Sequence, residues 1–208
     1  MMKVKTFVCN EYFSCNVYVC SDDKETFIVD AGYYEPEIEE YLKTVPPVQF
    51  IIQTHCHFDH IMGINELIKK YPEIKVYCHK EDIELAKDPR KNGSVLMAAP
   101  YVPECDFIPL GEGKNKINDF EFELIHTPGH TKGSCMYYFA DEKMLFTGDT
   151  IIGPSIGRTD LPTGSEADIY SSLEKIKKAG FSDDIKCFFG HGSAYSFADL
   201  RSFNPYIS

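Results

Sequence analysis

The 208-residue sequence contains no tryptophan and is short of positive charge. Lysine and arginine together number 21 against 32 aspartate and glutamate residues, so the formal net charge is −11. Nucleic-acid binding needs clustered cations that displace counterions, and this composition argues against such a partner. No apolar run approaches the roughly 18 residues that a membrane span requires, and the N-terminal segment lacks a signal peptide's long apolar core. We therefore expect no membrane partner and a cytoplasmic location.

Glycine and proline are also not enriched, at 14 and 12 residues, which excludes collagen-like and low-complexity chains. The eight cysteines are scattered through apolar stretches of a chain that is far longer than a disulfide scaffold. We therefore expect reduced, buried thiols rather than disulfides. With 43% hydrophobic residues the chain can build a sizeable core, and we predict one domain over residues 1–208.

Short apolar runs between polar turns predict strands, and apolar residues at helical spacing predict helices. Residues 88–104 carry several prolines and are predicted to form a long loop in which Met97 and Tyr101 are candidates to line a substrate entrance. Because strands and helices occur in both halves, we predict an α/β fold with two sheets face to face and helices outside. The predicted strands are 3–9, 16–20, 26–29, 48–53, 74–78, 120–126, 134–139, 144–147 and 186–189, and the predicted helices are 36–43, 61–71, 80–87 and 167–179.

A cluster of metal-ligand residue types follows the predicted strand 48–53. The segment reads Thr-His-Cys-His-Phe-Asp-His and contains His55, His57, Asp59 and His60. In extended chain the first two histidines are two residues apart, so both rings project to one face while Cys56 points to the other. Packing explains four ligand-type side chains within six residues poorly. The segment therefore predicts a metal site.

Three further segments place a ligand-type residue at the end of a predicted strand, next to glycine. They are Thr-Pro-Gly-His-Thr around His130, Thr-Gly-Asp-Thr around Asp149, and Gly-His-Gly around His191. Glycine lets the backbone turn sharply, and the preceding strand sets where the ligand points. These three residues join the cluster as candidate ligands.

From its first strands to its C-terminus, the sequence resembles the metallo-β-lactamase fold superfamily, in particular its glyoxalase II-like hydrolases. The resemblance implies a four-layer αβ/βα sandwich with the site at one edge, between the sheets. It also implies two divalent metal ions, one held by His55, His57 and His130, the other by Asp59, His60 and His191, with Asp149 bridging them. The segment Gly-Arg-Thr-Asp at 157–160 is similar to small glyoxalase II-like proteins and to persulfide dioxygenases.

The ligand set consists of nitrogen and oxygen donors, which suits zinc, our first choice, and also iron or manganese. Two such ions lower the pKa of a shared water towards ~7 and so supply hydroxide as the nucleophile, which we expect Asp59 to orient. A thioester is the substrate that needs the fewest catalytic groups at this site, because its thiol leaving group, with a pKa of ~8.5, departs without a proton donor. We therefore predict hydrolysis of small-molecule thioesters or related activated esters; the oligomeric state is left open.

Three other functions remain open. The first is a persulfide dioxygenase with one iron held by His55, His130 and Asp149, the facial triad of non-haem iron chemistry. The second is a phosphodiesterase, since binuclear sites also cleave phosphate esters. The third is a metal-binding or sensing protein without catalysis.

Four residues outside the ligand set are candidates for supporting roles. Arg158 and Asp160 form either a structural ion pair or a contact with the loop or the substrate. Asp30 is a turn acceptor that can also bind a ligand histidine, and His126 is either such a partner or a strand histidine satisfied elsewhere. We interpret Cys56 as a small buried filler.

Overall fold

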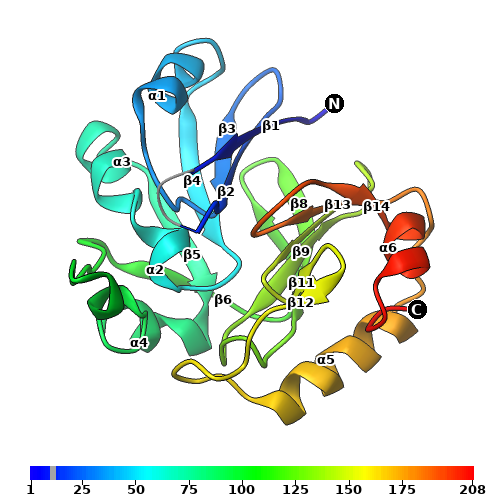
Figure 1. The fold of residues 1–208 in the computed structure, drawn as a ribbon. Helices are drawn as coiled ribbons and strands as arrows, with labels where there is room; N and C mark the ends of the chain where they lie inside the picture. The colour runs from blue at the N-terminus through cyan, green and yellow to red at the C-terminus, as the bar shows by residue number, and fades with distance from the viewer. Residues whose placement is uncertain (10–12) are drawn as a thin grey trace.

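Two six-stranded sheets face one another in the computed structural model, which describes residues 1–9 and 13–208 (Figure 1). The polar turn predicted between the first two strands includes residues 10–12, which lie outside the described residues. The first sheet has the order β1 (Lys3–Val8), β2 (Asn16–Ser21), β3 (Thr26–Val29), β4 (Val48–Gln53), β5 (Lys75–His79) and β6 (Phe107–Leu110). The second has the order β14 (Tyr195–Ser196), β13 (Lys186–Phe189), β10 (Met144–Gly148), β9 (Cys135–Phe139), β8 (Phe120–His126) and β7 (Gly113–Ile117).

Phenylalanine side chains from both sheets fill the space between them. Phe27 and Phe50 stack with ring centroids 4.9 Å apart, and Phe120 of the second sheet meets Phe27 edge-on at 4.6 Å. All three belong to one buried apolar cluster that draws on both sheets. Burial of large aromatic rings contributes much of the stability of such an interface, so this cluster holds the two halves together.

Helices cover the outer face of each sheet. Figure 1 shows α1 to α4 on one side of the paired sheets and α5 and α6 on the other. Each group of helices shares a buried apolar cluster with its own sheet. The predicted four-layer α/β sandwich is therefore confirmed. The helices are α1 (Pro36–Leu42), α2 (Phe58–Ile61), α3 (Ile64–Lys70), α4 (Ile83–Ala86), α5 (Glu166–Lys178) and α6 (Phe197–Phe203), with short 3₁₀ helices η1 (Lys80–Asp82) and η2 (Ser94–Met97) and a small hairpin β11 (Ile151–Ile152) and β12 (Ser155–Ile156).

Some predicted elements differ from the structure. The helix predicted for 61–71 is α3, which begins only at Ile64 because the backbone of Gly63 packs against that of Tyr33, and the short helix α2, ending at Ile61, precedes it. The segment 80–87 begins as the 3₁₀ helix η1 before α4, and the loop 88–104 contains η2. The strands β6, β7 and β14 and the helix α6 were not predicted. Among the described helices, none is long and apolar enough to cross a membrane.

The strand ends bring the candidate ligands to one edge of the sandwich. β4 and β13 run into the segments of His55 and His191, and β10 runs into Asp149. Gly148 closes β10 in the left-handed region with φ of 51°, where a Cβ would lie only 2.3 Å from Thr54 Oγ1. The amide of Cys135 donates to the Thr54 carbonyl (2.9 Å), which ties the two sheets together beside the site.

Candidate metal centre

Seven histidine and aspartate side chains converge at this edge. Their donor atoms form three overlapping groups in which all atoms lie within 4.8 Å of one another. They come from the segment after β4, the β8–β9 loop, and the ends of β10 and β13. The seven are His55, His57, Asp59, His60, His130, Asp149 and His191, the same residues that the sequence singled out.

The first group consists of three buried histidines. His57 Nδ1 lies 2.8 Å from His130 Nε2, which in turn lies 3.2 Å from His55 Nε2. His130 Nδ1 donates to the Arg158 carbonyl at 2.7 Å, which fixes the orientation of its ring. Three imidazole nitrogens that face a common point match the way metal ions are held by histidine.

The second group consists of Asp59, His60 and His191, and the third, which contains His55, His60 and Asp149, overlaps both of the others. His191 Nε2 lies 3.5 Å from Asp59 Oδ2, and His60 Nε2 lies 3.8 Å from the same oxygen. The Asp149 carboxylate lies 3.6 Å from His60 Nε2, 3.3 Å from His191 Nε2 and 3.5 Å from His130 Nε2. Asp149 therefore stands between the two groups.

Three buried polar atoms of this cluster have no hydrogen-bond partner among the described residues: His57 Nε2, His60 Nε2 and Asp149 Oδ1. An unsatisfied buried polar group costs about 1–3 kcal/mol, and His60 Nε2 and Asp149 Oδ1 lie 3.6 Å apart within the cluster, so these two atoms indicate a ligand that binds both. Gly190 leaves the space open, since a Cβ there would lie 2.0 Å from Asp149 Oδ1 and 2.7 Å from His60 Cε1.

The charge states of these side chains also suit cations. Burial lowers the pKa of His55 and of His57 well below the usual histidine value, so both rings are neutral. Burial opposes ionisation of Asp149, but the neighbouring His60, His191 and His130 outweigh it and hold its pKa well below the usual value. Neutral imidazoles and ionised carboxylates are the forms that bind metal ions, and His55, His57 and Asp149 therefore fit divalent cations.

His60 has the opposite electrostatic environment. Burial lowers its pKa, but the carboxylates of Asp59, Asp149 and Asp30 together outweigh burial and raise the pKa to about 10. Its Nδ1 donates to Asp30 at 3.0 Å, while its Nε2 faces the cluster. Asp30 also accepts from the amide and the hydroxyl of Thr54, both at 2.7 Å, and so connects the end of β4 to His60.

Asp82 is a buried carboxylate that the sequence analysis missed. It is fully buried and accepts from the amide of Cys56 (2.9 Å), the amide of Gly133 (2.7 Å) and the hydroxyl of Thr131 (2.8 Å). One carboxylate thus holds the backbone between His55 and His57 and the loop that follows His130. No motif signals this role, because Asp82 lies in a run of charged residues that is typical of an exposed helix face.

The variant Asp82→Ala should destabilise the protein by about 3 kcal/mol, because it leaves two buried amides without an acceptor. Since the same bonds hold both histidine loops, metal affinity should also fall, by about 10- to 100-fold. Denaturant unfolding and metal titration measure the two effects. Asp141→Ala, in an exposed turn, is the matched control. Unchanged metal affinity in Asp82→Ala would contradict a positioning role.

The remaining candidates lie in different places. Arg158 forms a two-bond ion pair with Asp160 at 2.6 and 2.7 Å, and both side chains are exposed. His126 is not brought to the cluster: its ring stacks on His79 with centroids 4.0 Å apart, and its Nε2 donates to the Lys132 carbonyl at 2.9 Å. This placement favours a strand histidine with its own partner.

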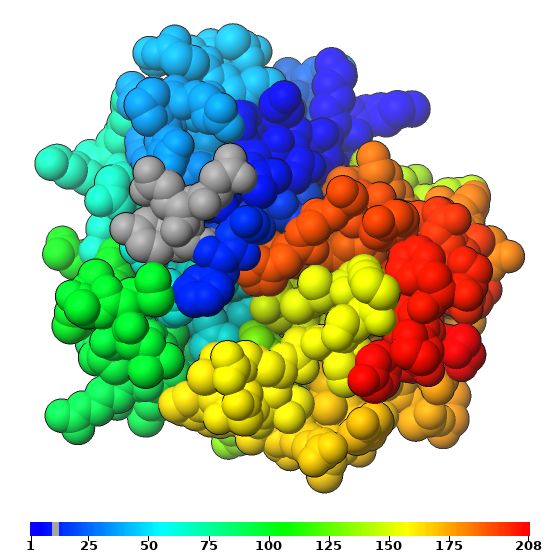
Figure 2. Space-filling model, in the orientation of Figure 1, coloured from blue at the N-terminus to red at the C-terminus, as the bar shows by residue number. Residues whose placement is uncertain are grey.

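A recess of about 340 Å³ opens above the cluster, and His57, Asp59, His130, Asp149 and His191 line it. The face shown in Figure 2 is hollowed between the blue, green and yellow segments. Gly93, Leu96 and Met97 of the 88–104 loop also line the recess, as predicted for Met97. Tyr101 instead packs against the buried apolar cluster that the first sheet shares with α1, α3 and α4. Its hydroxyl accepts from the Asn65 amide at 3.1 Å.

Comparison with known proteins gives consistent matches over most of the chain. The sequence model of the metallo-beta-lactamase superfamily matches residues 11–191. The probable metallo-hydrolase YqgX of Bacillus subtilis is 30% identical over 197 residues, which are 93% of this chain and 92% of YqgX. The hydroxyacylglutathione hydrolase GloC of Haemophilus influenzae is 27% identical over 198 residues, 91% of either chain. The crystal structure of the BLEG-1 B3 metallo-beta-lactamase has a TM-score of 0.88 at 31% identity and covers 100% of both chains.

Proposed function

Because the chain belongs to the metallo-beta-lactamase superfamily, we propose that it is a metal-dependent hydrolase of thioesters or related activated esters that uses two divalent cations. The observation that carries the proposal is the position of Asp149 between two groups of ligand-type side chains. A single ion would be bound by one of these groups, and the other group would then have no ligand. The relatives YqgX and GloC, whose names denote hydrolases, support the reaction class.

We assign His55, His57 and His130 to one cation and Asp59, His60 and His191 to the other, with Asp149 shared. When bound, divalent cations lower the pKa of water towards ~7 and polarise a carbonyl oxygen, which provides a nucleophile and an electrophile at neutral pH. Zinc suits this set of nitrogen and oxygen donors, as do iron and manganese. In this scheme Asp59, which lines the recess, orients the attacking water.

The supporting residues keep this arrangement rigid. Asp30 and the carbonyl of Arg158 accept from His60 and His130, so that each ring presents its other nitrogen to the cluster. His191 is held in the same way, because its Nδ1 donates to the Phe13 carbonyl at 2.8 Å. Such partners orient ligand rings and raise their basicity.

The choice of a thioester follows from the leaving group. A thiol with pKa ~8.5 departs as a thiolate, whereas an amide nitrogen needs a proton from a general acid. Among the described residues, the titratable ones that line the recess are the ligand-type side chains and Arg158. Arg158 does not release a proton at neutral pH, so the lining favours substrates whose leaving group needs no acid.

The proposal is tested with protein purified without added metal. We expect elemental analysis to find two metal ions per chain, and a thioester assay that follows the released thiol to give the same rate with and without oxygen. One iron per chain, with oxygen consumed on addition of a persulfide, would instead establish the dioxygenase alternative. Cleavage of a chromogenic phosphodiester without thioester cleavage would establish the phosphodiesterase.

A further inference from the structure

The recess above the metal centre has an apolar wall. Its large apolar side chains come from segments far apart in the sequence, namely Phe13, Phe58, Leu96, Met97, Ile152 and Leu161. With a volume of about 340 Å³, the recess lies at the small end of the ~300–1,000 Å³ range of small-molecule sites. It therefore suits a compact group rather than a large carrier.

The rim of this wall is exposed to solvent. Leu96 is 72% exposed and Phe13 is 64% exposed, which ranks both among the most exposed large apolar side chains of the described residues. Exposed apolar area costs about 25 cal/mol per Å², and where such side chains gather around a recess they mark a binding surface.

The position of Leu96 is defined by hydrogen bonds that lead to the metal centre. The amide of Phe58, next to His57, donates to the Asn92 carbonyl at 2.9 Å. Buried Asn92 in turn accepts from the Ser94 amide at 2.9 Å, at the start of η2. These hydrogen bonds fix the position of the Leu96 segment relative to the ligand side chains.

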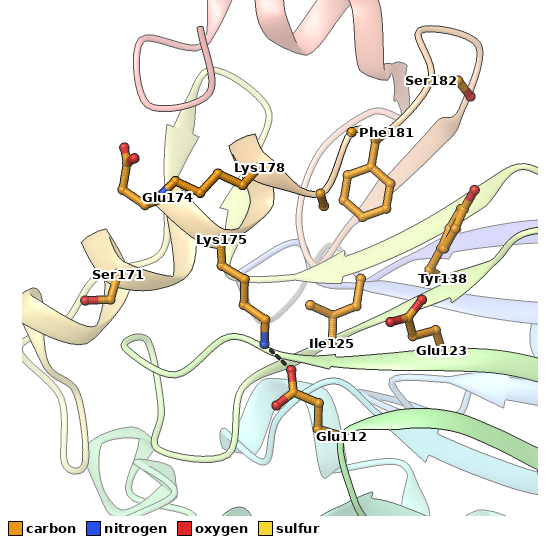
Figure 3. Close-up of a pocket in the computed structure, with 12 residues that line it drawn as sticks. Glu112, Glu123, Ile125, Tyr138, Ser171, Glu174, Lys175, Lys178, Phe181 and Ser182 are labelled. Atoms are coloured by element: carbon orange, nitrogen blue, oxygen red, sulfur yellow. Dashed lines mark hydrogen bonds and ion pairs between the residues drawn. The ribbon is translucent and has the colours of Figure 1, made fainter.

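A second groove on the molecule shows the contrast. The groove of about 780 Å³ between α5 and the β8–β9 strands is lined by five charged side chains, among which Lys175 pairs with Glu112 (Figure 3), and by apolar side chains such as Ile125 and Phe181. The two linings differ because that groove carries five charged side chains, whereas outside its ligand-type residues the recess carries Arg158 as its one charged side chain among the described residues.

The recess offers little to a carboxylate. Among its described lining residues, Arg158 is the one lysine or arginine, and both of its bonds to Asp160 use the guanidinium group. Asp59 and Asp149 also line the recess but are assigned to the cations, so beyond Arg158 the described lining offers a substrate carboxylate no further lysine or arginine. Glutathione carries two carboxylates, and such a thiol is poorly matched to this lining.

We propose, on the basis of the proposed thioester hydrolase function, that the substrate carries a compact, uncharged apolar group next to the thioester bond. An aryl or branched alkyl group packs against Leu96 and the other apolar side chains of the recess, while the carbonyl faces the ligand side chains. Recognition then comes from apolar burial instead of ion pairing with a charged thiol.

The test varies the thiol and the acyl group in turn. We expect kcat/KM to be at least about tenfold higher for the acetyl thioester of benzyl mercaptan than for S-acetylglutathione, and higher for phenylacetyl than for acetyl on one thiol. Leu96→Ser should remove most of the preference through KM. Ile108→Ser, an exposed apolar residue of β6 outside the recess, should retain it. Equal or better turnover of S-acetylglutathione, lost in Arg158→Gln, would overturn the inference.

A binding measurement separates this inference from the proposed function. Calorimetry should show that benzyl methyl sulfide binds at least about tenfold more tightly than S-methylglutathione, and that Leu96→Ser removes the difference. If no thioester is hydrolysed but this binding preference holds, the apolar recess stands and the thioester reaction is wrong. If thioesters are hydrolysed without any apolar preference, the reaction stands and the inference is wrong.

Discussion

Asp149→Ala and His57→Ala should each lower kcat/KM by at least about a thousandfold and should each be purified with less bound metal. Asp149 contacts both ligand groups, with its carboxylate 3.3–3.6 Å from ring nitrogens of His60, His130 and His191, so its removal should affect both of the proposed cations. His57 belongs to the first group alone, and we expect its variant to retain more metal. A loss of this size matches the removal of a group that stabilises charge in the transition state.

Cys56→Ser is the matched control, because Cys56 lies between His55 and His57 in sequence. Its side chain belongs to the buried apolar cluster beneath the helices and to none of the ligand groups among the described residues, and burial raises the pKa of the thiol, which disfavours the reactive thiolate. This variant should keep its metal and most of its activity. Full activity in His57→Ala, with unchanged metal content, would show that the assignment of the centre is wrong.

The convergence of the seven side chains could be predicted because each one follows a strand at a short, fixed spacing. His55 and His57 are two residues apart after β4, and Asp149 and His191 each follow a glycine at a strand end. Strands with continuous apolar sequence are buried on both faces, which made β4 and β13 easy to place. β4 lies in the first sheet and β13 in the second, and the segments that follow them meet at one edge of the sandwich.

Asp82 could not be predicted, because its role depends on partners that are distant from it in sequence. Its partners are the amides of Cys56 and Gly133 and the hydroxyl of Thr131, all far away in sequence. A single aspartate among lysine and glutamate residues resembles a solvated helix face, and only the tertiary structure reveals that it is buried. The apolar wall of the recess is equally hidden, since Phe13 and Leu96 come from separate loops.

Two of the unpredicted elements, β7 and β14, have a weak local pattern. β7 has the sequence Gly-Lys-Asn-Lys-Ile and buries only its last residue, so its strand conformation depends on pairing with β8. β14 is two residues long and forms only through its register with β13. Apolar periodicity identifies elements that bury one face. These two edge strands bury too few side chains to show such a pattern.

Addition of zinc to metal-free protein should raise its unfolding free energy, by about 4 kcal/mol at a free zinc concentration a thousand times the dissociation constant. The cluster is assembled from both sheets, so the unfolded chain offers no comparable site and metal binding favours the folded state. For a chain of this size the gain corresponds to a rise of roughly 10 °C in the melting temperature. Scanning calorimetry at several zinc concentrations measures it.

The dependence on the ligand side chains separates this centre from adventitious binding. Asp149→Ala should show a much smaller rise in melting temperature, because the carboxylate shared by the two groups is gone. The rise should also be larger at pH 8 than at pH 6, since protons compete with metal ions for histidine nitrogens and carboxylates. An equal rise in the variant and the native protein would mean that zinc binds elsewhere, and the seven side chains would then need another explanation for their unsatisfied buried atoms.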